Sequence, residues 1–197
     1  MSHRTSFRQL LKAHSVKVAE PGQEFTLASG AKSRFYIDVK QAAMRGSGHF
    51  HLGYLLYQEL FEADFENGKH ITGFAGVALG GCHLASIVAM YAICQGGSDL
   101  HDGPKYDVVY VRKEAKDHGT KNLVEGPKTG GKHVVLFEDV VTTGGSSLKA
   151  VKQLREAGYT VAGIIAVIDR RVKADRTTKL DDVPLKALYT LDDFDTV

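Results

Sequence analysis

The sequence predicts an α/β fold in which helices cover both faces of a central, mostly parallel sheet. Apolar runs of strand length alternate with segments whose apolar residues recur at helical spacing. The runs at 134–137 and 161–168 are almost wholly apolar, which is typical of strands buried on both faces. Between them, a helix is expected over 145–157, and Gly158 stands where helices commonly end in glycine.

The remaining elements are predicted from the same two periodicities. Phe7, Leu10, Leu11 and His14 share one face of a helix over 6–14, and Tyr54, Tyr57 and Phe61 indicate a helix over 50–61. Gly80 and Gly81 mark the turn from a strand into a helix that ends near Cys94. The predicted strands outside the pair described above are 35–39, 71–77, 106–111 and 185–188.

Length and composition limit the class of protein. The 197 residues predict a single domain, 1–197, and 43% hydrophobic with 24% charged residues excludes wholesale disorder. The net charge of +2 gives no general case for nucleic-acid binding. Cys82 and Cys94 cannot form a disulfide framework and are expected to be small buried groups in a reducing compartment.

Membrane and secretory segments are not expected. The first 14 residues carry charges throughout and contain no apolar core of a signal peptide. The most apolar stretch, 71–94, is interrupted by glycines and His83, so it reads as strand, turn and helix. We therefore expect a cytoplasmic protein that binds no membrane.

In sheets of this class, ligands bind at the carboxyl ends of the parallel strands. The string after the strand at 134–137 begins with two acids, Glu138 and Asp139, and continues through Val140 and Val141 into a loop of hydroxyls and glycines. Thr142, Thr143, Gly144, Gly145 and Ser146 then lead into a helix, whose N-terminus attracts anions. The loop predicts a cup for a phosphate monoester, with the acids suited to ribose hydroxyls; the simpler alternative is a capped helix with solvated acids.

The segment after the strand at 106–111 is rich in cations. Arg112, Lys113, Lys116, Lys121 and His118 lie within ten residues, and Gly119 supplies a hinge. Such a run is often a solvated surface loop. The functional alternative is a mobile lid that neutralises a departing pyrophosphate.

An arginine follows the strand at 161–168. Arg170 at this strand end is a bidentate partner for a planar carboxylate, or else the partner of a neighbouring acid in a salt bridge. The glycines and lysine of 126–132 fit a Walker loop only in part, because His133 replaces the Ser or Thr and a strand follows.

The 138–146 string resembles the phosphoribosyl diphosphate (PRPP) signature of type I phosphoribosyltransferases. The string Arg-Lys-Glu-Ala-Lys-Asp-His-Gly at 112–119 is similar to the mobile catalytic loop of orotate phosphoribosyltransferases. The resemblance implies a small N-terminal hood of about 1–45, a core of about 46–197, and transfer of ribose 5-phosphate from PRPP to orotate, with loss of pyrophosphate, in UMP biosynthesis.

The resemblance also implies the site residues. Lys116, His118 and Asp139 would be catalytic, and Arg170, Thr142 and Tyr36 would bind orotate. Mg²⁺ would be held mainly through PRPP, with no protein ligand assigned, and the loop would act across a homodimer. The residues implied to bind PRPP are Arg112, Lys113, Lys116, His118, Glu138, Asp139, Val140, Val141, Thr142, Thr143, Gly144, Gly145 and Ser146.

Two positions depart from the family pattern. Many members place lysines where this chain has Ala28 and Gly80, and Lys40 is a candidate substitute. A purine phosphoribosyltransferase would share the phosphate cup without needing the 112–119 string or Arg170. A PRPP-sensing regulator would add a basic helix or a helix-turn-helix, and the sequence shows neither.

Overall fold

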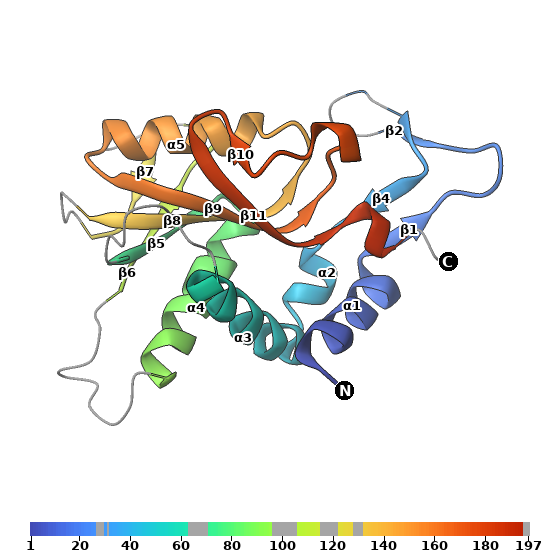
Figure 1. Ribbon diagram of the computed structural model, residues 1–197, viewed down its shortest axis with the longest axis horizontal. Coiled ribbons are helices and arrows are strands. Elements are labelled where there is room, and N and C mark those ends of the chain that lie inside the picture. The colour runs from blue at the N-terminus through green and yellow to red at the C-terminus, as the bar shows by residue number, and fades with distance from the viewer. Residues whose placement is uncertain are drawn as a thin grey trace. The chain divides into compact units, whose positions relative to one another are not determined.

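The computed structural model describes residues 1–26, 30, 32–62, 71–95, 106–114, 122–127 and 132–194 (Figure 1). The chain divides into two compact units, Met1–Leu52 and Gly53–Val197. Each unit is described by itself below.

The first unit combines short strands with α1 (His3–His14), α2 (Lys40–Ala43) and the start of α3 (Gly46–Glu62). The Ser2 hydroxyl caps α1 by accepting the Thr5 backbone N–H, and Phe7 and Leu11 form its buried face. Strand β1 (Val16–Val18) pairs antiparallel with β4 (Phe35–Ile37), and β2 (Phe25–Thr26) pairs with β3 (Lys32–Ser33).

The second unit is built on a sheet. In its described residues seven strands follow the order β10-β11-β9-β8-β5-β6-β7, and the five inner strands are parallel. The outer strands β10 and β7 pair antiparallel with their neighbours. The strands are β5 (Gly73–Val77), β6 (Asp107–Val111), β7 (Val124–Glu125), β8 (His133–Val141), β9 (Thr160–Asp169), β10 (Lys179–Leu180) and β11 (Val183–Thr190).

Two helices of this unit lie on opposite faces of the sheet. Helix α4 (Gly80–Gln95) packs on β5 and β8, and α5 (Gly145–Glu156) covers the other face (Figure 1). The chain moves outward from β5 to β6 in one direction and from β8 to β9 in the other. Right-handed crossovers in opposite directions place the helices on opposite faces. They also create a topological switch point, the place between β5 and β8 where the order of the strands reverses direction.

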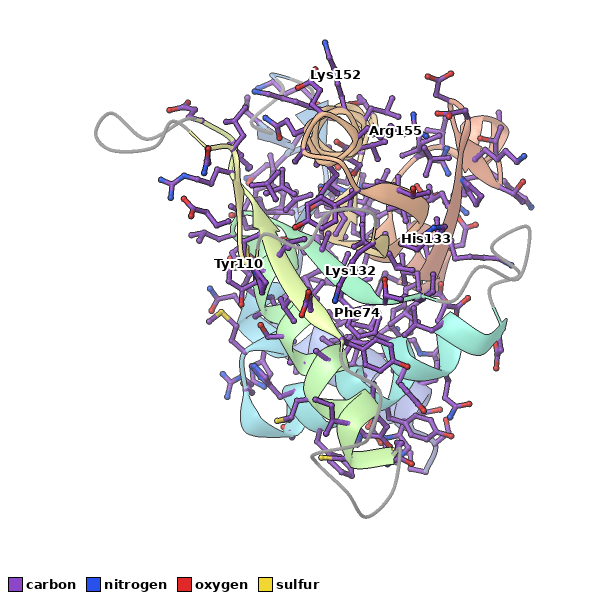
Figure 2. All side chains as sticks on the ribbon, turned by 90° about the vertical axis from the view of Figure 1, so that its left-hand side faces the viewer. Phe74, Tyr110, Lys132, His133, Lys152 and Arg155 are labelled. Carbon is purple, nitrogen blue, oxygen red and sulfur yellow. The ribbon has the colours of Figure 1, made fainter. Side chains whose placement is uncertain are left out.

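Side chains from the sheet and both helices form the core. Phe74 on β5 stacks on Tyr106 at a ring distance of 4.8 Å and meets Phe137 on β8 at 5.8 Å. Lys152 and Arg155 lie on the outer side of α5 (Figure 2). Fully buried side chains of the strands include Leu136, Ile164 and Phe137, so the sheet is apolar on both faces, as the sequence predicts.

The α/β class and the flanking helices are confirmed, and three local predictions are corrected. Strand β8 does not end at Phe137: its backbone pairs with β9 as far as Val141, so Glu138 and Asp139 lie within the strand. The last strand extends well beyond 185–188 to Val183–Thr190. Cys94 is exposed at the end of α4 and Cys82 is only partly buried, so neither is the fully buried thiol expected.

Two further short 3-10 helices, Lys173–Asp175 and Leu191–Asp193, follow β9 and β11. Among the helices of the described ranges, none combines the length and apolar character that crossing a membrane requires.

Leu136 tests the packing of the core, because it is completely buried in the middle of β8. Leu136→Ala is expected to lower the free energy of unfolding by about 2–5 kcal/mol, since it removes apolar contacts and leaves a cavity. Urea denaturation measures the change. The control Lys152→Ala, on the solvent side of α5, should change it by less than about 0.5 kcal/mol; equal effects of the two would contradict this description of the core.

Candidate active site

The carboxyl ends of β5 and β8 lie side by side at the switch point. The two strands are paired as far as Gly76 and Phe137. After β5 the chain passes through Ala78 and Leu79, which are joined by a cis peptide bond, into α4 at Gly80. After β8 it passes through the Thr142–Gly144 turn into α5. Two helix N-termini therefore begin beside two adjacent strand ends, where the sheet class places its ligands.

Glu138 is the buried acid of this site, with only 4% of its surface exposed. The hydroxyls of Ser146 and Ser147 each donate to its Oε2 at 3.3 Å. Burial and then the neighbouring Asp139 carboxyl raise the pKa of Glu138 to about 8, against an ordinary value of 4.5. The direction of this shift favours the protonated form of Glu138, which can donate a hydrogen bond.

Asp139 lies against the start of α4. A Cβ atom on Gly80 would come within 2.1 Å of the Asp139 carboxyl group, so the absence of a side chain at Gly80 permits the contact. The Val140 backbone N–H also donates to Asp139 Oδ1 at 2.9 Å. The site thus joins a buried acid with a raised pKa to a second, more accessible acid near the positive end of a helix.

The turn between β8 and α5 presents backbone and hydroxyl groups to solvent. Gly144 caps the helix in the left-handed region (φ +82°), and a Cβ there would meet Leu180 at 2.7 Å. The Gly145 N–H donates to Thr143 Oγ1 at 3.4 Å. Thr142, Thr143, Gly145 and Ser146 are exposed, and the first turn of α5 contains no acid. This geometry suits a phosphate group.

Two cationic residues, Arg112 and Lys113, follow the last residue of the neighbouring strand β6. The Arg112 N–H donates to the Leu123 carbonyl at 2.8 Å, and Arg112 Nη1 lies 3.6 Å from Glu125 Oε1. The two side chains of this pair are 39% and 35% exposed. Lys113 follows with its side chain in solvent.

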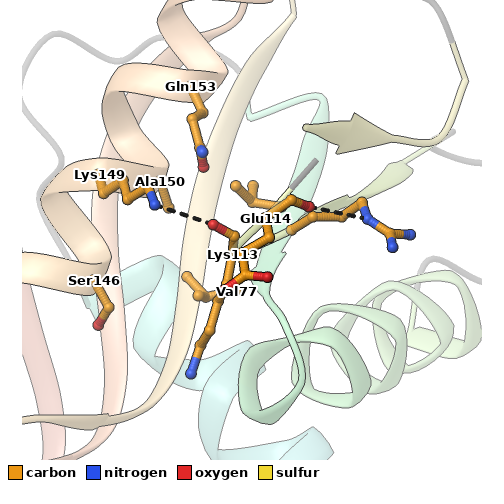
Figure 3. A pocket seen from close by; sticks show the side chains of 9 residues that line it. Val77, Lys113, Glu114, Ser146, Lys149, Ala150 and Gln153 are labelled. Atoms are coloured by element: carbon orange, nitrogen blue, oxygen red, sulfur yellow. Dashed lines mark hydrogen bonds between the residues drawn. The ribbon is translucent and has the colours of Figure 1, made fainter. Parts of the chain in front are cut away.

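A pocket of about 290 Å³ separates these cations from α5. Lys149 reaches across it from α5 and donates to the Lys113 carbonyl at 3.0 Å (Figure 3). Lys149 is not among the residues predicted from the sequence, although its spacing of three from Ser146 places both on one helical face. The lining residues are Val77, Val111, Arg112, Lys113, Glu114, Ser146, Lys149, Ala150 and Gln153.

Arg170 starts beside the phosphate turn. Its N–H donates to the Val141 carbonyl at 2.8 Å, which places it next to Thr142 across the β8–β9 pair. The next residue forms a salt bridge of its own, because Arg171 Nη2 lies 2.8 Å from Asp169 Oδ2. Partial burial lowers the pKa of Arg170.

The other predicted site residues divide into two groups. Tyr36 belongs to the first unit, where it is 42% exposed and its ring lies 5.8 Å from that of Phe25. Lys116, His118 and Ala28 lie outside the described residues. Within the described ranges, no group of three or more His, Cys, Asp or Glu side chains is arranged as a metal site.

Comparison with known proteins identifies the class. Residues 51–192 match the phosphoribosyl transferase domain family, so the chain belongs to the phosphoribosyltransferases. The chain is 41% identical to an orotate phosphoribosyltransferase of Sorangium cellulosum, over 85% of this chain and 82% of that protein. It is 37% identical to the orotate phosphoribosyltransferase of Aquifex aeolicus, over 97% of both chains. These relatives place it in the orotate phosphoribosyltransferase branch of the family.

Solved structures agree with this placement. A crystal structure of orotate phosphoribosyltransferase from Mycobacterium tuberculosis has a TM-score of 0.72 at 27% identity, covering 98% of this chain and 99% of the other. The enzyme from Aeropyrum pernix has a TM-score of 0.65 at 29% identity, with 94% of each chain covered. The resemblance stated from the sequence is thereby confirmed.

The raised pKa of Glu138 predicts a pH-dependent stability. Between pH 4.5 and 8 the folded protein keeps a proton that the unfolded chain has released, so this contribution is complete below pH 4.5 and disappears as pH rises towards 8. Relative to Glu138→Gln, the wild-type free energy of unfolding should therefore fall with rising pH, by up to about 1.4 kcal/mol per pH unit.

Urea denaturation of both proteins at pH 5, 6, 7 and 8 measures this difference. The matched control is Glu156→Gln, at an exposed glutamate near the end of α5, whose curve should run parallel to that of the wild type. If the free energy of unfolding of Glu138→Gln also runs parallel to that of the wild type across this pH range, Glu138 does not keep its proton on folding.

Proposed function

We propose that this enzyme transfers the ribose 5-phosphate group from PRPP to a ring nitrogen of orotate, giving orotidine 5′-monophosphate and pyrophosphate, a step of pyrimidine biosynthesis. The observation that carries the proposal is the grouping at the carboxyl ends of β8 and β9. The two acids lie within the paired backbone of β8 and β9, and the phosphate-binding turn and Arg170 follow directly at its end. These groups match the ribose, the 5′-phosphate and the carboxylate of the reactants.

The 5′-phosphate is held by the turn at Thr142–Ser146. Its oxygens accept from the exposed N–H and hydroxyl groups around the start of α5, and the helix dipole favours the negative charge. Glu138 and Asp139 hold the ribose hydroxyls. Protonated Glu138 donates while Asp139 accepts, and the remaining negative charge lies close to the positive charge that develops on the ribose.

The leaving pyrophosphate needs positive charge. Arg112 and Lys113 supply it from the end of β6, and Lys116 and His118 supply more from the segment that follows. Asp139, the more accessible of the two acids, fits Mg²⁺, because this ion binds proteins through one or two carboxylates and fills its shell with water and substrate phosphates. When bound, Mg²⁺ neutralises pyrophosphate charge, and it is held mainly through PRPP.

Orotate is recognised by its planar carboxylate. Arg170 forms the bidentate contact, Thr142 beside it contacts the same base, and Tyr36 stacks on the pyrimidine face. We further propose that the enzyme is a homodimer in which the segment carrying Lys116 and His118 acts on the partner's substrates. Arg112 and Leu123, which are joined by a backbone hydrogen bond, bring the two ends of this segment together at the strand end.

An ultraviolet assay of orotate consumption tests the proposal. Purified protein with PRPP and Mg²⁺ should consume orotate and release one pyrophosphate for each orotate. Parallel reactions with adenine, hypoxanthine and uracil are expected to be at least a hundredfold slower, because none of these bases carries a carboxylate for Arg170. Preference for a purine would replace this proposal with a purine phosphoribosyltransferase.

Lys116→Ala tests the leaving-group assignment. The substitution should lower kcat by about 10²–10³, the usual effect of losing one preorganised charge contact in a transition state, while the KM for orotate changes little. Steady-state kinetics measures both constants. Lys152→Ala is the control on an exposed face of α5. An unchanged kcat in Lys116→Ala would remove Lys116 from the mechanism.

A further inference from the structure

Two adjacent arginines follow β9, and their surroundings differ. Arg170 is partly buried beside Thr142, where the proposed function assigns it to the orotate carboxylate. Arg171 is turned into the protein, and its side chain is 8% exposed against 7% for its partner Asp169. The proposed reaction uses Arg170 but leaves the buried pair beside it without a role.

The Arg171 guanidinium is bonded on every nitrogen. Nε donates to both carboxylate oxygens of Asp169 at 3.1 and 3.2 Å, and Nη2 donates to Oδ2 at 2.8 Å. Nη2 also donates to the Thr177 carbonyl at 2.9 Å, and Nη1 donates to the Thr177 hydroxyl at 3.4 Å. These contacts close residues 171–177 into a ring that is fixed to the end of β9.

A second arginine continues the network. Arg176 Nε donates to the Arg171 carbonyl at 2.8 Å, and its Nη1 lies 2.6 Å from Asp192 Oδ2 after β11. The segment that follows Arg170 is therefore bound through its side chains to the ends of two strands. Burying a charged pair is rarely a gain in stability over apolar packing, so we assign to this pair the specific geometry that it imposes on the chain.

That geometry acts on Arg170. The residue before it, Asp169, and the residue after it, Arg171, are joined to each other through both side chain and backbone, since the Arg171 N–H donates to Asp169 Oδ1 at 3.0 Å. The Arg170 N–H is itself bonded to β8. Arg170 thus starts from a backbone fixed on both sides. A bidentate contact with a carboxylate depends on the direction of the guanidinium plane, and a displacement of about 1 Å can cost a hundredfold in rate.

We propose that Arg171, held by Asp169 and Thr177, is a positioning residue that aims Arg170 at the carboxylate of the pyrimidine, and so sets the preference for a carboxylated base. The inference rests on the proposed function and deepens it. Arg171 touches neither substrate, so its loss should weaken only those complexes in which the carboxylate is present.

The test compares two nucleotides that differ only in that group. Calorimetry gives the Kd of orotidine 5′-monophosphate and of uridine 5′-monophosphate, which lacks the carboxylate. In the wild type, the ratio of the two constants measures the preference for the carboxylate. Arg171→Met should reduce this ratio at least tenfold, because it weakens the binding of orotidine 5′-monophosphate. The Kd of uridine 5′-monophosphate should change less than twofold. Arg171→Lys, which keeps a charge for Asp169, should recover part of the ratio.

Two comparisons separate positioning from general damage. Arg155→Met removes another bidentate arginine–aspartate pair, which joins α5 to Asp182 at 2.7 Å, and should leave the ratio unchanged. The double variant Arg170→Met/Arg171→Met should have the ratio of Arg170→Met within twofold, because Arg171 acts through Arg170. A further tenfold loss in the double variant would overturn the inference, as would a wild-type ratio in Arg171→Met.

The outcome stays decisive if Arg171→Met does not fold. Thr177→Val, which removes the hydroxyl bonded to Arg171 Nη1, should then lower the ratio about threefold, and a wild-type ratio would overturn the inference. A wild-type protein that binds both nucleotides equally would contradict the proposed function itself. A wild-type preference that survives in Arg171→Met would contradict only the role of Arg171.

Discussion

The pairing of β8 with β9 up to the last residue of each strand is the constraint on which the site depends. Val141 opposes Asp169, and Arg170 still donates to the Val141 carbonyl beyond the end of β9. This pairing keeps Glu138 and Asp139 within β8. The phosphate turn begins directly after the last residue of β8, and Arg170 lies beside the start of that turn. Three kinds of recognition thus share one rigid frame, and rigid elements hold catalytic geometry better than loops.

The acids and the cations of the site come from different elements of the fold. The buried Glu138 lies inside, between β8 and the first turn of α5, while the second acid lies over the start of α4. Cations leave β6 on the side of the phosphate turn, and Lys149 ties them to α5. Because opposite charges approach from different elements, the positive ribose and the negative pyrophosphate of one transition state can be stabilised together.

The sequence predicted most of the frame and only part of the site. The buried strands, the helix start at Gly80 and the helix end at Gly158 follow from periodicity and glycine position, which are local properties. The end of β8 could not be predicted, because Glu138 and Asp139 are poor strand residues and only pairing with β9 keeps them there. The hydrogen bond from Arg170 to Val141, and the contact of Lys149 with Lys113, join residues distant in the chain. Such tertiary contacts leave no periodic signal.

The close approach of Gly80 to Asp139 makes these two positions depend on each other. Any side chain at position 80 would need the space that the carboxyl group of residue 139 now fills. A lysine introduced there would first have to displace that acid before offering its own charge to an anion. The direction of the Asp139 side chain is therefore set in part by what position 80 lacks, and a larger residue at that position would re-aim the acid within the site.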